Sequence, residues 1–334
     1  TLTNVPGLKG EWAHIRRDVS NGVVTLSAKS AVDAVFAQGY VHAVERLYQL
    51  DISRRKAKGT VAEVLGEDYV SHDKISRTLN IPTLANQDWE RLCDAAETKD
   101  KDAKSVEQSR KQVALLRAYA AGINAYLSED PVMPLEFYVY YGAMRDFFYN
   151  WGRTPRIEPW TPVDTLAVMR MHAFESSHGW EREYLKAVLV EEVGYDAADS
   201  LLSSSSSSPL AAAASGRVTW LPASTGTAWA FSPRGTGSKR APLMGTDIQG
   251  PVDSYIRWYQ NELSWASFGS DSQATVVSGA SLPGVPLVMQ GRNEHLSWGW
   301  AVADEDSEDL FVEDIVRADS DGDSDNGGKE SAEC

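Results

Sequence analysis

Cysteine is scarce in this chain of 334 residues, which contains only Cys93 and Cys334. The two lie far apart, and their spacing matches neither a metal site nor a disulfide framework, so they leave the redox compartment open. Long apolar runs are absent as well. No run reaches the roughly 20 residues that a membrane-spanning helix needs, and we therefore expect no membrane partner.

Basic residues are in deficit, since 32 lysines and arginines face 47 acidic residues and the net charge is -15. This surplus of negative charge disfavours nucleic acid and anionic membranes as partners. Much of it lies near the C-terminus, where thirteen acidic residues fall in 304–334 against Arg317 and Lys329. The rest of the chain is only mildly acidic.

The last stretch, 319–334, has no apolar side chain larger than alanine. Such a segment cannot bury enough surface to offset its ordering entropy, and it is predicted to be a disordered tail. Its acidic spacing is similar to a calcium-binding EF-hand loop, but Ser324 stands where the sharp turn requires glycine. A solvated end is the favoured interpretation.

A signal peptide is missing from the start of the sequence, which begins at Thr1. The chain is therefore expected to be mature, trimmed or a fragment. Its compartment stays open on this ground.

Residue patterns divide the chain into regions. Residues 1–202 are mostly helical by periodicity, and residues 203–226 form a Ser/Ala-rich linker or spacer. Residues 227–318 carry strand-length runs separated by turns, and the acidic tail 319–334 follows. The length is enough to bury one large or two medium-sized cores.

Local signals place several elements. The Asn-Gly pair at 21–22 predicts a hairpin near the N-terminus. Through 31–52 apolar residues recur at helical spacing, with Asp33 near the helix start. Thr161 is predicted to cap a helix that has Pro162 in its first turn.

Other runs are assigned by charge and length. The stretch 94–112 is highly charged and is predicted to be a solvated helix face, and 115–127 an apolar helix. The stretch 161–193 is predicted to form one or two long helices. The runs 274–277 and 286–289 are predicted to be strands.

The junction between the linker and the strands is the most informative short stretch. Residues 203–208 are all serine, which is typical of a linker, and 227–231 read Thr-Ala-Trp-Ala-Phe, which is typical of a short buried strand. A flexible linker joined directly to a strand has two interpretations. It is a loop between two elements, or a place where the chain is cut and the strand's new first residue becomes functional.

A second informative stretch is the acidic run 304–309, which is followed by Leu310 and Phe311. Carboxylate and carbonyl oxygens are the ligands that Ca²⁺ prefers, so the run is a candidate cation site. By composition alone, a solvated acidic loop is the favoured interpretation.

Several short sequence blocks of the chain together resemble the penicillin acylase (penicillin amidase) family of the N-terminal-nucleophile hydrolase superfamily. They occur in family order and cover nearly all of the chain up to about Val316. The resemblance rests on residues 33–43, 45–50, 54–55, 59–66, Asp73 with Arg77, 121–126, 159–164, 180–183, 228–229, 243–249 and 282–311.

The resemblance implies an α+β fold, an αββα sandwich in which two antiparallel sheets lie between helical layers, with a mostly helical α-chain region around it. It also implies a precursor that cleaves itself, loses a spacer and becomes an α/β heterodimer. The implied activity is hydrolysis of carbon–nitrogen bonds other than peptide bonds in linear amides. Calcium would be a structural ion, no organic cofactor is implied, and related proteins are secreted or periplasmic.

The implied substrate is a small-molecule amide, an N-acyl amine such as a penicillin or an acyl-homoserine lactone. In such enzymes the β chain begins with a serine, whose hydroxyl attacks the amide carbonyl while its own α-amine acts as base. A terminal amine has a pKa of about 7.7–8.0 and accepts a proton near neutrality. Histidine is therefore not required, and the six histidines are predicted to be structural or surface residues.

The chain departs from the family pattern at the nucleophile. Counting back from Trp229 puts Gly226 at the position of the family's serine. With one residue deleted, Thr227 becomes the nucleophile, although a one-residue slip in a strand turns side chains to the other face. Ser224 or Thr225 with an insertion is a second route. A chain that neither processes nor catalyses is the remaining interpretation.

The resemblance assigns further roles around the nucleophile. The backbone N–H of Val302 matches an oxyanion-hole donor, and a backbone donor tolerates a change of side chain. Gln249 matches a residue that lines the acyl pocket. Met169 and Phe174 match the helix region that borders this pocket, although core packing alone also explains them.

Calcium ligands are also implied by the resemblance. On the β-chain side they are Asp306, the carbonyl of Glu308, and Asp309. On the α-chain side Glu181 matches after a shift of one residue, so Glu183 stays open.

The family's β chain continues well beyond this length, and there it supplies a second oxyanion donor, an asparagine side chain, and a nearby arginine. Neither is found before Cys334, so the second half of the fold is predicted to be incomplete. Three hypotheses remain: a linear-amide hydrolase, a non-catalytic or fragmentary family member, and an acidic calcium-binding protein without enzymatic activity.

Overall fold

A computed structural model describes residues 8, 12–98, 102–140, 157–176, 179–203, 225–233, 242–249, 257–266, 274–301 and 309–311. The chain divides into two compact units. The first combines Thr1–His178 with Ser215–Asp304, and the second combines Gly179–Ala214 with Glu305–Cys334. The calcium residues that were predicted at 306 and 308, the oxyanion residue at 302 and the linker 204–224 lie outside the described residues.

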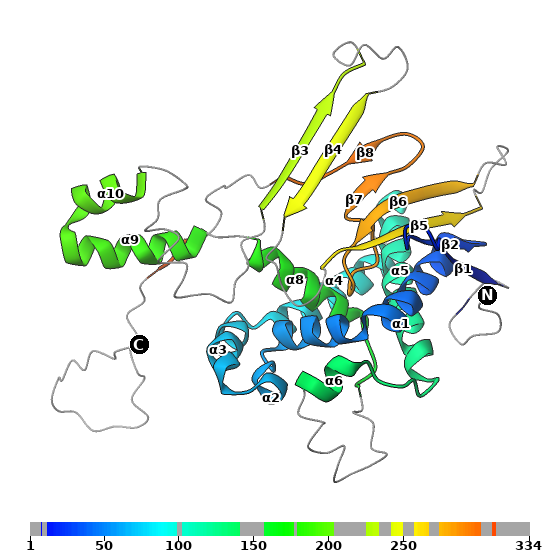
Figure 1. The fold of residues 1–334 in the computed structure, drawn as a ribbon, viewed down its shortest axis with the longest axis horizontal. Coiled ribbons are helices and arrows are strands. Elements are labelled where there is room, and N and C mark those ends of the chain that lie inside the picture. The colour runs from blue at the N-terminus through cyan, green and yellow to red at the C-terminus, as the bar shows by residue number, and fades with distance from the viewer. Residues whose placement is uncertain are drawn as a thin grey trace, which may run out of the picture. The chain divides into compact units, whose positions relative to one another are not determined.

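The first unit contains most of the helices and the strands (Figure 1). Its helices are α1 (Ala31–Lys58), α2 (Ala62–Leu65), the short 3₁₀ helix η1 (Glu67–Tyr69), α3 (Val70–Thr78), α4 (Ile81–Glu97), α5 (Ala103–Leu127), α6 (Leu135–Tyr140) and α8 (Pro162–Glu175). Its strands are β1 (Ala13–Arg17), β2 (Val24–Ala28), β3 (Thr225–Phe231), β4 (Leu243–Gln249), β5 (Tyr259–Trp265), β6 (Thr275–Ser281), β7 (Gln290–Arg292) and β8 (Ser297–Trp298).

A six-stranded sheet has the order β1-β2-β5-β6-β7-β8. Strands β2 and β5 pair in parallel, with Leu26 opposite Leu263, and the other neighbours are antiparallel. The sheet is therefore mixed rather than wholly antiparallel, and its one parallel pair joins a strand from before the linker to a strand from after it. Strands β3 and β4 form a separate two-stranded antiparallel sheet.

The predicted N-terminal hairpin is confirmed as β1 and β2. Gly22 has φ 73°, which a glycine adopts without steric cost. The Asn21 side chain accepts a hydrogen bond from the backbone N–H of Val23 at 2.9 Å and so closes the turn.

Helix α1 begins and ends at clear capping residues, and it runs further than the predicted 31–52. The hydroxyl of Ser30 accepts a hydrogen bond from the N–H of Asp33 at 3.2 Å. Gly59 ends the helix in a left-handed conformation, φ 65°. Helix α8 begins as predicted, with a capping box in which Thr161 and Asp164 bond each other's backbone N–H groups.

Helices α1 and α5 cross at a pair of glycines. A Cβ atom placed on Gly122 would collide with the carbonyl of Phe36, and one on Gly39 with the carbonyl of Tyr119. The two backbones touch here because neither position carries a side chain. The contact brings both helices against the same face of the sheet (Figure 1).

The main core lies between this helical layer and the six-stranded sheet. Leu47 and Leu50 from α1, Ile123 from α5, and Leu26 and Leu263 from the sheet are all buried in one cluster. The helical region and the strand region therefore share one core, which makes them mutually dependent for stability.

Some predicted elements differ from the observed ones. The charged stretch 94–112 is not one helix, since α4 ends at Glu97 and α5 begins at Ala103. The stretch 286–289 is not a strand, and β7 begins only at Gln290. Pro286 has no N–H to give to a ladder, which is consistent with a turn there.

The second unit is described by itself. It contains α9 (Gly179–Val193) and α10 (Tyr195–Ser203), which pack together. Lys186 of α9 bonds Asp199 of α10 at 2.8 Å. Across the described parts of both units, no helix combines the length and the apolar character needed to cross a membrane.

Candidate active site

The hairpin of β3 and β4 carries the predicted nucleophile. Thr227 pairs with Asp247, and Gly226 pairs with Ile248. Trp229 is 49% exposed in this hairpin. The prediction of a buried strand is therefore wrong, because in the described residues no second layer covers these side chains.

A cleft of about 440 Å³ lies between β4 and the face of the six-stranded sheet that points away from the helices. The hydroxyl of Thr246 donates to Oε1 of Gln290 at 2.8 Å, and this bond ties the hairpin to β7. Polar side chains of the sheet line the cleft, among them Gln260, Glu262 and Arg292. The lining can donate and accept hydrogen bonds to a ligand.

The register of the hairpin fixes the direction of Thr227. Neighbouring residues of a strand point to opposite faces, and directly paired residues share a face. Thr246 faces Gln290 across the cleft, so Asp247 and its partner Thr227 face the other way. In the uncut hairpin Thr227 is an exposed residue on the face that points away from the cleft.

The other residues assigned around the nucleophile are placed as follows. Gln249 ends β4 opposite Thr225, and its side chain is outside what the structure describes. Met169 is 39% exposed on α8. Phe174 packs into a small helical cluster with Met171 of the same helix. Their roles at the acyl pocket stay predictions.

A different face of α8 turns toward the strands. Val168 contacts the turn at Gly284, and the ring of His172 lies 6.3 Å from that of Trp258. Phe174 packs in the helical core, which agrees with the earlier alternative that core packing alone explains this residue.

The segment just before Val302 is held to the loop that precedes β7. The indole N–H of Trp298 donates to the carbonyl of Val288 at 3.1 Å, and that of Trp300 to the carbonyl of Met289. The oxyanion role of the Val302 backbone lies outside the described residues and stays a prediction.

One contact bears on the calcium residues, and it lies within the second unit. The backbone N–H of Leu310 donates to Oε2 of Glu183 at 2.6 Å. The contact places Glu183 next to the backbone that follows Asp309. The side chain of Glu181 is not among those described. Among the described residues no group of three acidic, histidine or cysteine side chains gathers.

A buried serine–histidine contact exists in the first unit. His42 is wholly buried, and its Nε2 lies 3.0 Å from Oγ of Ser281. The hydroxyl of Tyr119 accepts the N–H of Gly284 at 2.8 Å and lies 2.7 Å from Nδ1 of His42. The tautomer that gives the proton of Tyr119 an acceptor has Nδ1 accepting and Nε2 protonated.

This tautomer disfavours base catalysis by the pair. In it Nε2 of His42 donates to the hydroxyl of Ser281, which in turn donates to the carbonyl of Tyr259 at 3.1 Å. A nitrogen that donates to the serine does not also accept the proton of that serine. Burial also lowers the pKa of His42 to about 3. The network joins α1, α5 and β6 and supports the prediction that this histidine is structural.

Several residues that carry the family resemblance are also structural. Both carboxylate oxygens of Asp73 accept backbone N–H groups, from Val61 at 2.9 Å and from Ala62 at 2.8 Å. Arg54 bonds Asp51 at 2.8 Å, and its neighbouring charge contributes to the lowered pKa of this carboxyl, which burial opposes. The Asp73 bonds fix the turn between α1 and α2, and the Arg54–Asp51 bond lies within α1.

The comparison with known families decides the assignment. The family model for penicillin amidase matches residues 12–333. The chain belongs to the penicillin amidase family. The match spans both the helices before the linker and the strands after it, as the order of the resembling blocks had indicated.

Relatives include a penicillin acylase 2 proenzyme of Pseudomonas sp. (strain SE83), 35% identical over 167 residues, which cover 50% of this chain and 18% of that protein. An acyl-homoserine lactone acylase, QuiP, of Pseudomonas putida is 25% identical over 94% of this chain and 37% of its own length. The chain thus spans less than two fifths of the length of these relatives.

A solved structure, a thermostable penicillin G acylase from Alcaligenes faecalis, is also similar, at 25% identity. The superposition covers 57% of this chain and 89% of that one, with a TM-score of 0.38. The α+β class is confirmed by the helices and strands themselves.

The sequence reading missed one group of polar residues. Gln49, Glu175 and Arg257 come together in a small cavity between α1 and α8. A partial signal was present, because Gln49, Ser53 and Lys56 recur at helical spacing on α1. No local pattern could bring Arg257, more than 200 residues later, to the same place.

Proposed function

We propose that the protein hydrolyses a linear amide and releases a carboxylic acid from an N-acyl amine. The observation that carries the proposal is the family match across residues 12–333. The names of the relatives, penicillin acylase and acyl-homoserine lactone acylase, favour an acyl chain joined to a β-lactam or a homoserine lactone as substrate. A secreted or periplasmic location belongs to the same proposal.

The proposed mechanism uses Thr227 as an N-terminal nucleophile after the chain is cut behind Gly226. The freed α-amine would take the hydroxyl proton, and the hydroxyl would attack the amide carbonyl to form an acyl-enzyme that water hydrolyses. The N–H of Val302 would stabilise the developing oxyanion. Release of the strand end at Thr227 would also free its hydroxyl from the face that it occupies in the uncut hairpin.

Calcium is proposed as a structural ion of the second unit. Glu183 and Asp309 would bind it together with Asp306 and the carbonyl of Glu308, and the bond between Glu183 and Leu310 favours Glu183 over Glu181. The bound ion would cross-link α9 to the segment after the sheet. The two chains produced by the cut would form an α/β heterodimer.

Turnover of chromogenic amides tests the activity. The purified chain should hydrolyse a phenylacetyl or a long-acyl anilide, and Thr227→Ala should abolish this hydrolysis. Thr225→Ala is a matched control two residues earlier in β3 and should retain it. No turnover by the unmodified chain on either substrate would contradict the proposal.

A second candidate is a non-catalytic family member that binds amides or acids in the cleft. The observation that favours it is the direction of Thr227, which faces away from the cleft in the uncut hairpin. This candidate predicts calorimetric binding of phenylacetate or a fatty acid without turnover, and the same binding by Thr227→Ala.

A further inference from the structure

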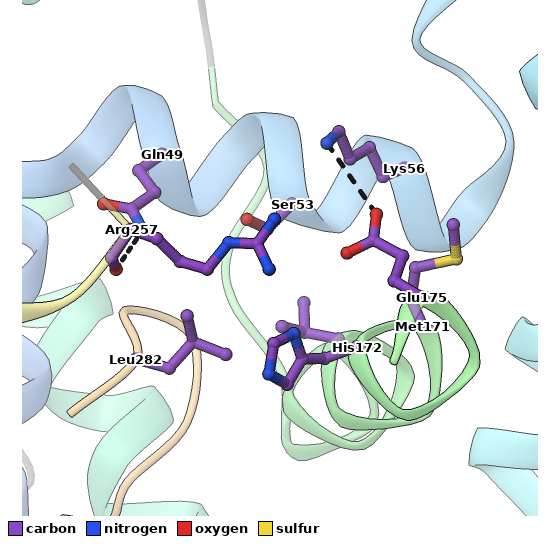
Figure 2. A pocket seen from close by; sticks show the side chains of 9 residues that line it. Gln49, Ser53, Lys56, Met171, His172, Glu175, Arg257 and Leu282 are labelled. Carbon is purple, nitrogen blue, oxygen red and sulfur yellow. Dashed lines mark hydrogen bonds and ion pairs between the residues drawn. The ribbon is translucent and has the colours of Figure 1, made fainter. Parts of the chain in front are cut away.

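A small cavity lies between α1 and α8 in the first unit, apart from the cleft beside β4. Its volume is about 30 Å³. Figure 2 shows that side chains from α1, from α8 and from the residue before Trp258 all turn toward it. The polar ones are Gln49, Ser53, Lys56, His172, Glu175 and Arg257.

Two buried oxygen atoms in this cavity have no hydrogen bond. Nε2 of Gln49 donates to the carbonyl of Arg257 at 2.8 Å, which fixes the amide orientation and leaves Oε1 unpaired among the described residues. Oε1 of Glu175 also lacks a hydrogen bond there, and Lys56 Nζ lies 3.8 Å from it. Gln49 is 3% exposed and Glu175 is 6% exposed, so bulk water does not supply the missing donors.

An unpaired donor faces the same cavity. The guanidinium of Arg257 projects between Ser53 and His172 (Figure 2), and it forms no hydrogen bond or ion pair with any residue that the structure describes. Its charge also acts on His172, where burial and Arg257 together lower the pKa of the imidazole. The cavity is thus lined by the guanidinium of Arg257 and by two acceptor oxygens, and the N–H groups of the guanidinium do not reach these oxygens.

The size and chemistry of the cavity select its occupant. A polar cavity needs a volume of about 10–15 Å³ to hold one water molecule, so this cavity holds about two. It is too small for an organic ligand. An inorganic anion would meet the carboxylate of Glu175, and a dry cavity would leave each buried acceptor unsatisfied.

We propose that this cavity is a water-binding site, in which one or two ordered waters join the guanidinium of Arg257 to Oε1 of Glu175 and Oε1 of Gln49. Water both accepts from arginine and donates to carbonyl and carboxylate oxygens, and it is small enough for the cavity. The result is a water-bridged ion pair between the half-buried Arg257 and the buried Glu175.

The position of this ion pair gives it a role in holding the unit together. Gln49 and Glu175 precede the linker, and Arg257 follows it. The waters therefore connect the helical region to the start of β5. If the chain is cut at the linker, as the proposed function requires, the same waters join two separate chains. The inference itself does not depend on the cut.

A crystal structure of the whole chain at about 1.5 Å resolution tests the proposal directly. One or two solvent peaks are expected within about 3.2 Å of Glu175 Oε1, Gln49 Oε1 and the guanidinium of Arg257. An empty cavity would overturn the proposal, and so would a direct bond between Arg257 and Glu175. A bromide soak that gave an anomalous peak in the cavity would overturn it in favour of an anion.

Substitution of Ser53 gives a test in solution. If the cavity is hydrated, Ser53→Val expels water and lowers the urea midpoint of unfolding, whereas in a dry cavity the added methyl groups fill a void and raise it. Ser71→Val, at an exposed position of α3, corrects for the helix propensity of valine. A midpoint for Ser53→Val at or above that of Ser71→Val would contradict the proposal.

The coupling between the charges is a third readout. Arg257→Leu and Glu175→Gln should each lower the urea midpoint, and the double variant should lose less than the sum of the two. Arg292→Leu, outside the cavity, should show additive behaviour with Glu175→Gln. If the losses from Arg257→Leu and Glu175→Gln simply add in the double variant, the bridged interaction is contradicted.

Discussion

At the scale of single residues, the assignment of hydrogen-bond donors and acceptors separates structural groups from catalytic ones. The hydroxyl of Tyr119 contacts both the N–H of Gly284 and Nδ1 of His42, so both partners depend on one hydroxyl. The same accounting disfavours Ser281, which lies 3.0 Å from His42, as a nucleophile. Distance alone would have suggested the opposite.

Tyr119→Phe should destabilise the first unit by about 1–3 kcal/mol, because it leaves two buried groups without a partner. The urea midpoint measures the loss. Tyr69→Phe removes a hydroxyl from a side chain that is 36% exposed and should change the midpoint little. Equal effects of the two changes would show that the buried network contributes nothing.

Stability should fall as the pH drops below about 6.5. The pKa of His42 is about 3 in the folded state, below its ordinary value of 6.5. Between these values the unfolded chain binds a proton that the folded chain does not. The contribution of His42 to stability is therefore fully present above pH 6.5 and is lost as the pH falls toward 3. His72 and His172 shift in the same direction through burial.

The titration of His42 alone changes the free energy of unfolding by at most about 1.4 kcal/mol per pH unit. Urea midpoints at pH 7.5, 6.5 and 5.5 measure it in a range where ordinary carboxylates do not titrate. His42→Gln should show a shallower decline than the unmodified chain. A midpoint that rises on acidification would contradict the sign.

At the scale of elements, the contact between α1 and α5 depends on glycine. Gly122→Ala should improve helix propensity by about 1 kcal/mol. The added Cβ would nevertheless collide with the backbone of α1 at Phe36 and cost about 1–3 kcal/mol or more. Thermal unfolding should show a net loss, and a more stable variant would mean that the helices are not packed this closely.

The link between α9 and the segment 309–311 gives a second prediction at this scale. Glu183→Gln and Asp309→Asn should each weaken calcium binding by about tenfold or more, because each removes a carboxylate from the proposed site. Glu181→Gln is the matched control on the same helix and should leave the affinity unchanged. Titration calorimetry with CaCl₂ decides between the two glutamates.

Elements with local signals were predicted well, and long-range arrangements were not. The hairpin at Gly22, the cap at Ser30 to Asp33 and the capping box at Thr161 follow from side chains within three residues of one another. The parallel pairing of β2 with β5 joins residues more than 230 apart, which no local pattern specifies.

The candidate site shows the same limit. The family order of motifs located the hairpin and the acidic run, but it could not show that Thr227 shares a face with Asp247 rather than Thr246. Direction within a strand depends on register, and register depends on the partner strand. The cavity at Arg257 likewise required the tertiary fold.

At the scale of the whole molecule, helices from before the linker and strands from after it share one core. A cut in the linker would therefore leave two chains that stay associated, since each buries apolar surface against the other. In this state the start of β3 would become a free N-terminus without loss of the fold.

The intact mass of the purified protein tests this account most directly. The account predicts two co-purifying chains, the second beginning at Thr227, and a single uncut chain for Thr227→Ala. A single uncut chain from the unmodified sequence, or a cut that persists unchanged in Thr227→Ala, would contradict an N-terminal nucleophile at this position.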